Sequence, residues 1–188
     1  MMMIPFAPMT TALVLTTLVA LPLTAAETYK IGPEASKVTF SIKNKPPGGN
    51  DFQDVPGSFK EFSGTWSLNP ADLTKSTVQM EVKTTSVDTA NEKRDDHLRS
   101  QDFFKVKEFP SMSFKSAAFK KVSDDTYEVT GAFTLLGKTK PVKVMFKTTG
   151  AASGTATFQI KRSEFGMTYR VPDTADEVDV KLDIVGTK

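Results

Sequence analysis

The chain has 188 residues, a formal net charge of +2, one histidine and no cysteine. The absence of cysteine excludes a fold held by disulfides and a lipid-modified cysteine. The 24 basic and 22 acidic residues are interspersed, and no basic run interleaved with aromatic residues indicates a nucleic-acid-binding protein.

Residues 1–26 are predicted to be a cleaved signal peptide. Residues 12–21 are apolar and uncharged, and the small residues Thr24, Ala25 and Ala26 precede Glu27, as signal peptidase requires. The alternative is a transmembrane anchor, but Pro22 interrupts the apolar run, which falls short of the roughly 20 residues that a span needs. We therefore expect one mature domain over residues 27–188, without a membrane span, in the periplasm. Secretion beyond the periplasm is the alternative location.

Alternation of apolar and polar residues predicts about eight β-strands in the mature part. Short turns between them favour antiparallel neighbours, and the single apolar face of each strand must be buried in a barrel or a two-layer sandwich. Several strands of about ten residues, or roughly 33 Å, favour a tall barrel with room for side chains or one slender ligand. A bulge or a sharp bend is expected at Ser63-Gly64. The expected strands lie near residues 38–42, 57–68, 78–82, 112–115, 129–135, 142–146, 156–160 and 178–184.

One short helix is predicted over residues 90–101. Asp88-Thr89 offers an N-cap, and Glu92 lies early in the segment, where the helix dipole favours an acid. A polar helix followed by Phe103-Phe104 within an all-β chain is typical of a lid or a ligand contact. One side of this helix is expected to carry Arg94, His97, Leu98 and Gln101.

Several motifs, in order and at the expected distances, resemble the YceI-like family of periplasmic proteins. They are Tyr29-Lys30-Ile31, residues 36–40, 57–59, 62–64, 86–89, 94–104, 109–114 and 131–142, Arg162 with Phe165-Gly166, and the last strand from Glu177. The resemblance implies an all-β fold, an eight-stranded antiparallel lipocalin-like barrel that binds a polyisoprenoid. Two features depart from the family: Ala35 stands where a histidine is common, and the loop over residues 45–54 is longer and more polar.

Two sets of residues are candidates for ligand contact. The large apolar residues predicted to line a tunnel, or alternatively to fill a core, are Phe40, Trp66, Met80, Phe103, Phe104, Met112, Phe114, Val144 and Phe158. The residues predicted to contact a head group are Arg94, His97 and Arg99. The alternative for the arginines is pairing with Asp95, Asp96 or Asp102, and for His97 a capping or packing role.

The predicted function is non-covalent binding, for transport or storage, of a polyisoprenoid or related amphiphilic lipid. Burial of its chain is the driving force. The alternative is a ligand-free protein-interaction or stress-response module. An enzyme is not predicted, because no cysteine or Gly-x-Ser-x-Gly motif accompanies the single histidine. The same scarcity of ligands predicts no metal, and no cofactor is expected. The sequence leaves homodimer formation open.

Overall fold

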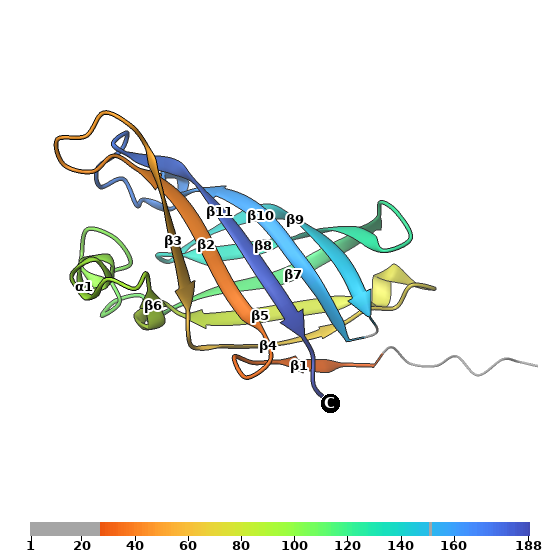
Figure 1. Ribbon diagram of the computed structural model, residues 1–188. Coiled ribbons are helices and arrows are strands. Elements are labelled where there is room, and N and C mark those ends of the chain that lie inside the picture. The colour runs from red at the N-terminus through yellow and green to blue at the C-terminus, as the bar shows by residue number, and fades with distance from the viewer. Residues whose placement is uncertain (1–26, 151) are drawn as a thin grey trace, which may run out of the picture.

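The computed structural model describes residues 27–150 and 152–188. The predicted signal peptide over residues 1–26 lies outside this described part. The described residues form an all-β fold with one short α-helix, in which a single antiparallel sheet curls around a core (Figure 1). None of the helices in residues 27–150 and 152–188 has the length and apolar character needed to cross a bilayer.

The sheet has eleven strands in the order β1-β4-β5-β7-β8-β9-β10-β11-β2-β3-β6. The strands are β1 (Tyr29–Ile31), β2 (Lys37–Asn44), β3 (Gln53–Phe59), β4 (Phe62–Ser67), β5 (Thr77–Lys83), β6 (Val87–Asp88), β7 (Ser111–Lys121), β8 (Thr126–Leu135), β9 (Lys138–Gly150), β10 (Ser153–Lys161) and β11 (Thr174–Val185). The helices are α1 (Glu92–Arg99) and three 3₁₀ turns, η1 (Leu73–Lys75), η2 (Thr84–Ser86) and η3 (Arg162–Phe165).

The predicted count of eight strands is wrong, for two reasons. The segment 57–68 is not one bent strand: β3 ends at Phe59 and β4 begins at Phe62, separated by the exposed Lys60 and Glu61. The expected bulge or sharp bend at Ser63-Gly64 is also wrong, since both residues pair with β5 in β4 without a shift of register. The other two additional strands, β1 and β6, have only three and two residues, too few to show an alternating pattern.

The curl of the sheet brings its two sides together. The consecutive strands β3 and β4 lie near opposite ends of the strand order, so the chain between them crosses from one side of the sheet to the other. Near the helix, Ser58 and Phe59 of β3 pair with β6. At the far end, the Lys30 N–H donates to the Thr187 carbonyl at 2.7 Å, which joins β1 to the segment after β11. The result is a half-barrel formed by one curled sheet (Figure 1).

Aromatic side chains fill much of this interior where neighbouring strands carry glycine. The Phe114 ring occupies the space that a Cβ on Gly131 would take, and the Phe146 ring does the same at Gly154. At the β1 end, Trp66 packs edge-on against Phe146 at a ring-centroid distance of 5.3 Å. Each of these rings lies on the inner face of its strand, so the core sits inside the curl.

Candidate functional site

An inner cavity lies within the half-barrel, and its wall is almost wholly apolar. Strands β2, β4, β5 and β7 to β11 supply its lining. Six of the nine residues predicted to line a tunnel face this cavity: Trp66, Met80, Met112, Phe114, Val144 and Phe158. The inner cavity is therefore suited to hydrocarbon, which gains free energy on leaving water.

An outer cavity adjoins the inner one toward helix α1. Its wall includes the other three predicted tunnel residues, Phe40, Phe103 and Phe104, and again Met112. The two cavities share Val38, Met112 and Val180 in their walls, so these side chains form the junction between them. All nine predicted residues thus face a cavity, while their contact with a ligand stays a prediction.

Polar side chains are concentrated in the wall of the outer cavity. They come from β2, the residue after β6, helix α1, the segment after β10 and the start of β11. They are Asn44, Thr89, Arg94, His97, Arg162, Tyr169, Arg170 and Thr174. No aspartate or glutamate of the described residues belongs to this wall. The outer cavity thus combines an apolar surface with cations and hydrogen-bond donors.

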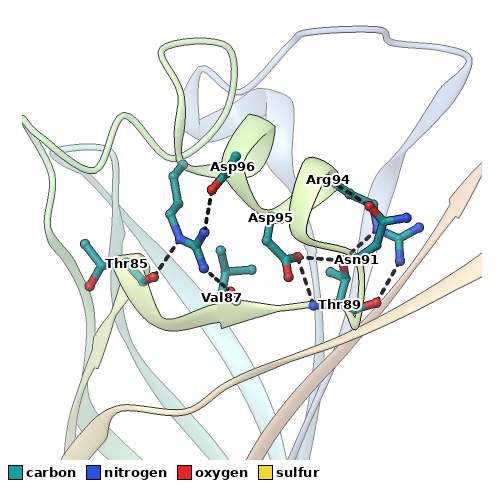
Figure 2. A network of polar contacts seen from close by, with 8 residues as sticks. Thr85, Val87, Thr89, Asn91, Arg94, Asp95 and Asp96 are labelled. Atoms are coloured by element: carbon teal, nitrogen blue, oxygen red, sulfur yellow. Dashed lines mark hydrogen bonds and ion pairs between the residues drawn. The ribbon is translucent and has the colours of Figure 1, made fainter.

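Helix α1 is fixed by a network centred on Thr89 (Figure 2). Asn91, not the predicted Asp88-Thr89, is its N-cap, and the Asn91 side chain accepts a hydrogen bond from the Arg94 N–H. The buried Asp95 carboxylate accepts from the Thr89 N–H at 2.9 Å and from its hydroxyl at 2.6 Å. The Arg94 guanidinium donates to the Thr89 hydroxyl at 2.7 Å and to its carbonyl at 2.8 Å. These bonds hold Arg94 at the cavity wall.

Arg99 lies elsewhere. Its guanidinium donates to the carbonyls of Thr85 and Val87, both at 2.9 Å, and pairs with Asp96 at 3.0 Å (Figure 2). It does not line the outer cavity. These contacts tie α1 to η2 and β6, which is a structural role, so Arg99 is not among the head-group residues that we retain.

His97 lies at the wall of the outer cavity among aromatic rings. Its Nε2 atom is 2.8 Å from an Asp102 carboxylate oxygen. Its ring packs edge-on against Phe103 and Tyr169, with centroid distances of 5.1 and 5.2 Å. Arg94, His97 and Leu98 all face the cavity from one side of α1, as the helical spacing predicts, whereas Gln101 is not in its wall.

Arg162 also belongs to the wall of the outer cavity, and the sequence analysis did not predict it as a site residue. Its side chain is almost completely buried, with 1% of its surface exposed. It donates to the carbonyls of Ala175 and Thr174 at 2.8 Å, Tyr169 at 2.9 Å and Met167 at 3.1 Å. Burial lowers the pKa of its guanidinium, while the charge of Asp176 acts in the opposite direction.

A sequence signal for Arg162 exists. Ala156, Phe158 and Ile160 alternate on the inner face of β10, and Arg162 is the next position in that series. The neighbouring residues Tyr169 and Arg170 gave no comparable signal, because they lie in an irregular connection whose path depends on the bonds made by Arg162. The sequence reasoning therefore missed the part of the site that β10 and the connection to β11 supply.

The family model of the YceI-like domain matches residues 29–186, so the chain belongs to the YceI-like family. A UPF0312 protein of Azotobacter vinelandii is 32% identical over 141 residues, which cover 70% of this chain and 73% of that protein. Protein YceI of Escherichia coli is 31% identical over 172 residues, covering 87% of this chain and 88% of the relative.

Solved structures share the fold. Burkholderia cenocepacia BcnA has a TM-score of 0.73 and 29% identity, covering 84% of this chain and 99% of BcnA. A polyisoprenoid binding domain from Saccharophagus degradans has a TM-score of 0.60 and 13% identity, covering 85% of this chain and 98% of that domain. At that identity the second likeness concerns the fold alone.

Proposed function

We propose that this chain binds a polyisoprenoid or a related amphiphilic lipid inside its half-barrel and holds it for transport or storage. The observation that carries the proposal is the pair of adjoining cavities, one apolar and one with a polar wall. The polyisoprenoid-binding description of the S. degradans domain, which has the same fold, supports the choice of ligand class.

The difference between the two cavities supports one direction for the bound lipid. The hydrocarbon chain occupies the inner cavity, because each Å² of apolar surface removed from water contributes about 25 cal/mol. The polar end remains in the outer cavity, where Arg94, His97 and Tyr169 offer hydrogen-bonding groups. Burying that polar end in the inner cavity would leave it without partners. Met112 lies at the junction and, as a flexible side chain, adapts to a chain passing it.

The proposed function includes no chemical step on the lipid. His97, the only histidine of the chain, contacts Asp102 and two aromatic rings. A histidine acting as general base would activate a hydroxyl or thiol held next to it. The chain has no thiol, and none of the described hydroxyl groups is bonded to His97. We further propose that the lipid is carried in the periplasm, to which the predicted signal peptide would direct the chain.

Native mass spectrometry of protein purified from cells, with and without incubation with a long-chain polyprenol, tests the proposal. We expect a population heavier by one lipid, and the extra mass should disappear under denaturing conditions. The variant Val144→Asp, which places a carboxylate in the inner cavity, should lose the lipid, whereas Lys143→Asp on the outer face should keep it. A parent protein that stays ligand-free in both samples would favour a protein-interaction module instead.

A further inference from the structure

Exposed apolar side chains gather at one end of the half-barrel. Among the described residues, six large apolar or aromatic side chains are strongly exposed, and three of them are Phe52, Tyr169 and Val171. Phe52 ends the loop of residues 45–52 between β2 and β3, and the other two lie in residues 166–173, between η3 and β11. Both connections extend beyond the sheet at the end where α1 lies, and we call them together the rim (Figure 1).

Lys45 joins the two connections of the rim. Its backbone N–H donates to the Asp173 carbonyl at 2.7 Å, and its own carbonyl accepts a hydrogen bond from the Arg170 guanidinium at 3.2 Å. Its ammonium group lies 4.9 Å from the centre of the Phe52 ring, which is a cation–π contact. The rim is therefore one joined surface that presents apolar side chains from both connections.

The rim borders the outer cavity. Tyr169 and Arg170 belong to the wall of this cavity and are also exposed to solvent, so the cavity reaches the surface of the molecule beside the rim. The Tyr169 ring packs edge-on against Phe103, with a centroid distance of 5.3 Å. Aromatic residues with a polar tip, together with basic residues, are typical of a protein surface that lies at a bilayer interface.

The backbone of the rim suits contact with lipid. A backbone N–H that leaves water without finding a partner is costly. Pro46, Pro47 and Pro172 have no N–H group. The N–H groups of Gly49 and Val171 are bonded within the rim, to carbonyl oxygens at 2.9 and 3.2 Å. These parts of the rim need no water to satisfy their donors.

The charges of the rim balance. Its basic residues are Lys45 and Arg170, and its acidic residues are Asp51 and Asp173. A surface that is held by attraction to an acidic partner needs an excess of positive charge. Burial of apolar surface is therefore the driving force that the rim offers to a partner.

The opposite end of the half-barrel lacks this combination. Val122, in the turn between β7 and β8, is more exposed than Val171, and this turn lies far from α1 (Figure 1). Its neighbours are charged, since Asp124 and Asp125 follow it and Asp124 pairs with Lys121 at 3.0 Å. A single exposed apolar side chain among charges is ordinary on a protein surface.

We infer that the rim docks the protein on the surface of a phospholipid bilayer, held by insertion of apolar side chains rather than by charge. Phe52 and Val171 enter the head-group region, and Tyr169 lies at its boundary with water. A bilayer fits the rim better than a second copy of the chain, because a second copy would cover the opening of the outer cavity. This preference rests on the proposed function, which requires exchange of lipid through that opening.

Co-sedimentation with neutral vesicles of phosphatidylcholine and phosphatidylethanolamine tests this inference. We expect protein purified from cells to bind the vesicles equally at low and high salt. The double variant Phe52→Ser/Val171→Ser should partition into them at least about tenfold more weakly, because it loses the inserted side chains. Val171→Ser alone should also bind more weakly, whereas its matched control Val122→Ser, at the opposite end, should bind as the parent does.

A second measurement locates the contact. In the variant Phe52→Trp, the emission of the new tryptophan should move to shorter wavelength when vesicles are added. Lipids brominated near the head group should quench it. In the parent, the buried Trp66 lies inside the half-barrel, and vesicles should leave its emission unchanged. An unchanged emission of Phe52→Trp on vesicles that have bound it would contradict the inference.

The outcomes separate this inference from the proposed function. A parent protein that does not sediment with vesicles, or that leaves them at high salt, would overturn the inference and leave lipid uptake, measured by native mass spectrometry, intact. Equal partitioning of the parent and the folded double variant would also overturn it. If the double variant does not fold, Val171→Ser and Phe52→Trp decide. A dimer in light scattering that the double variant loses would assign the rim to a second copy and overturn bilayer docking.

Discussion

Thr89 links two charged residues of helix α1 to the polar wall of the outer cavity. Its hydroxyl donates to Asp95 and accepts from Arg94, and its backbone N–H and carbonyl bind the same two residues. A buried carboxylate that loses a donor costs about 1–3 kcal/mol, because its desolvation is no longer offset. The Thr89 hydroxyl therefore helps to hold the helix in place, together with the bonds that Arg99 makes to η2 and β6.

We predict that Thr89→Val lowers the free energy of unfolding by about 1–3 kcal/mol, since the isosteric side chain lacks the hydroxyl. Thr89→Ser, which keeps the hydroxyl, should lose clearly less. Urea denaturation of the three proteins measures the difference. Equal losses in the two variants would show that the methyl group, and not the hydrogen bonds, is what matters at this position.

Asp176 is a residue through which the stability of the fold should depend on pH. Burial alone would raise the pKa of its carboxyl, but hydrogen bonds from Ser163 and the charges of Arg162 and Lys161 lower it. A lowered pKa in the folded state means that this group stabilises the fold above its unfolded pKa of about 3.9, and that the contribution is lost as the pH falls through the folded value.

We therefore predict that Asp176→Asn is less stable than the parent at neutral pH, and that the difference shrinks as the pH falls below about 4. Thermal unfolding across a pH series measures this. The exposed Asp51→Asn, in the loop between β2 and β3, is the matched control and should unfold as the parent does. A difference that grows in acid would contradict the assigned direction of the pKa shift.

Among the structural elements, β7 contributes Met112 to the junction, where it borders both cavities together with Val38 of β2 and Val180 of β11. A larger side chain at the junction should close the way from the outer cavity to the inner one. We predict that Met112→Trp weakens binding of a long polyprenol by about tenfold or more, and binding of a short isoprenoid much less. Competition binding with ligands of increasing chain length measures this.

Met145→Trp is the matched control for that variant, because Met145 lies on β9 with its side chain exposed on the outside. It should bind both ligands as the parent does. An unchanged affinity of Met112→Trp for the long ligand would contradict the assigned junction, provided that its circular dichroism spectrum shows the parent's fold.

The elements differ in how far the sequence predicts them. Strands such as β8 and β11, with ten and twelve residues, show a clear alternation, and the sequence reasoning found them. Strands β1 and β6 depend on pairing with distant segments, β4 and β3, and are too short for an alternating pattern to identify them. The N-cap of α1 was placed too early because Thr89, a good capping residue, is bound to the side chains of Arg94 and Asp95 instead.

At the scale of the whole molecule, the sequence predicts the all-β class and the burial of one strand face, since both follow from local alternation. The closure of the sheet does not follow from it, because long-range contacts such as Lys30 with Thr187 decide it. The candidate site was likewise predictable only in part. Inward aromatic residues were predictable from alternation, whereas Arg170 reaches the cavity only through the path of an irregular connection.

The central claim is that a lipid lies in the half-barrel with its chain toward Trp66 and its polar end toward α1. Trp66 is the only tryptophan of the chain, and it lines the inner cavity. Its fluorescence should be quenched strongly by a bound isoprenoid that carries bromine at the tail end, and weakly by one that carries bromine beside the head group. Equal quenching by the two ligands, or none by either once binding is saturated, would contradict the claim.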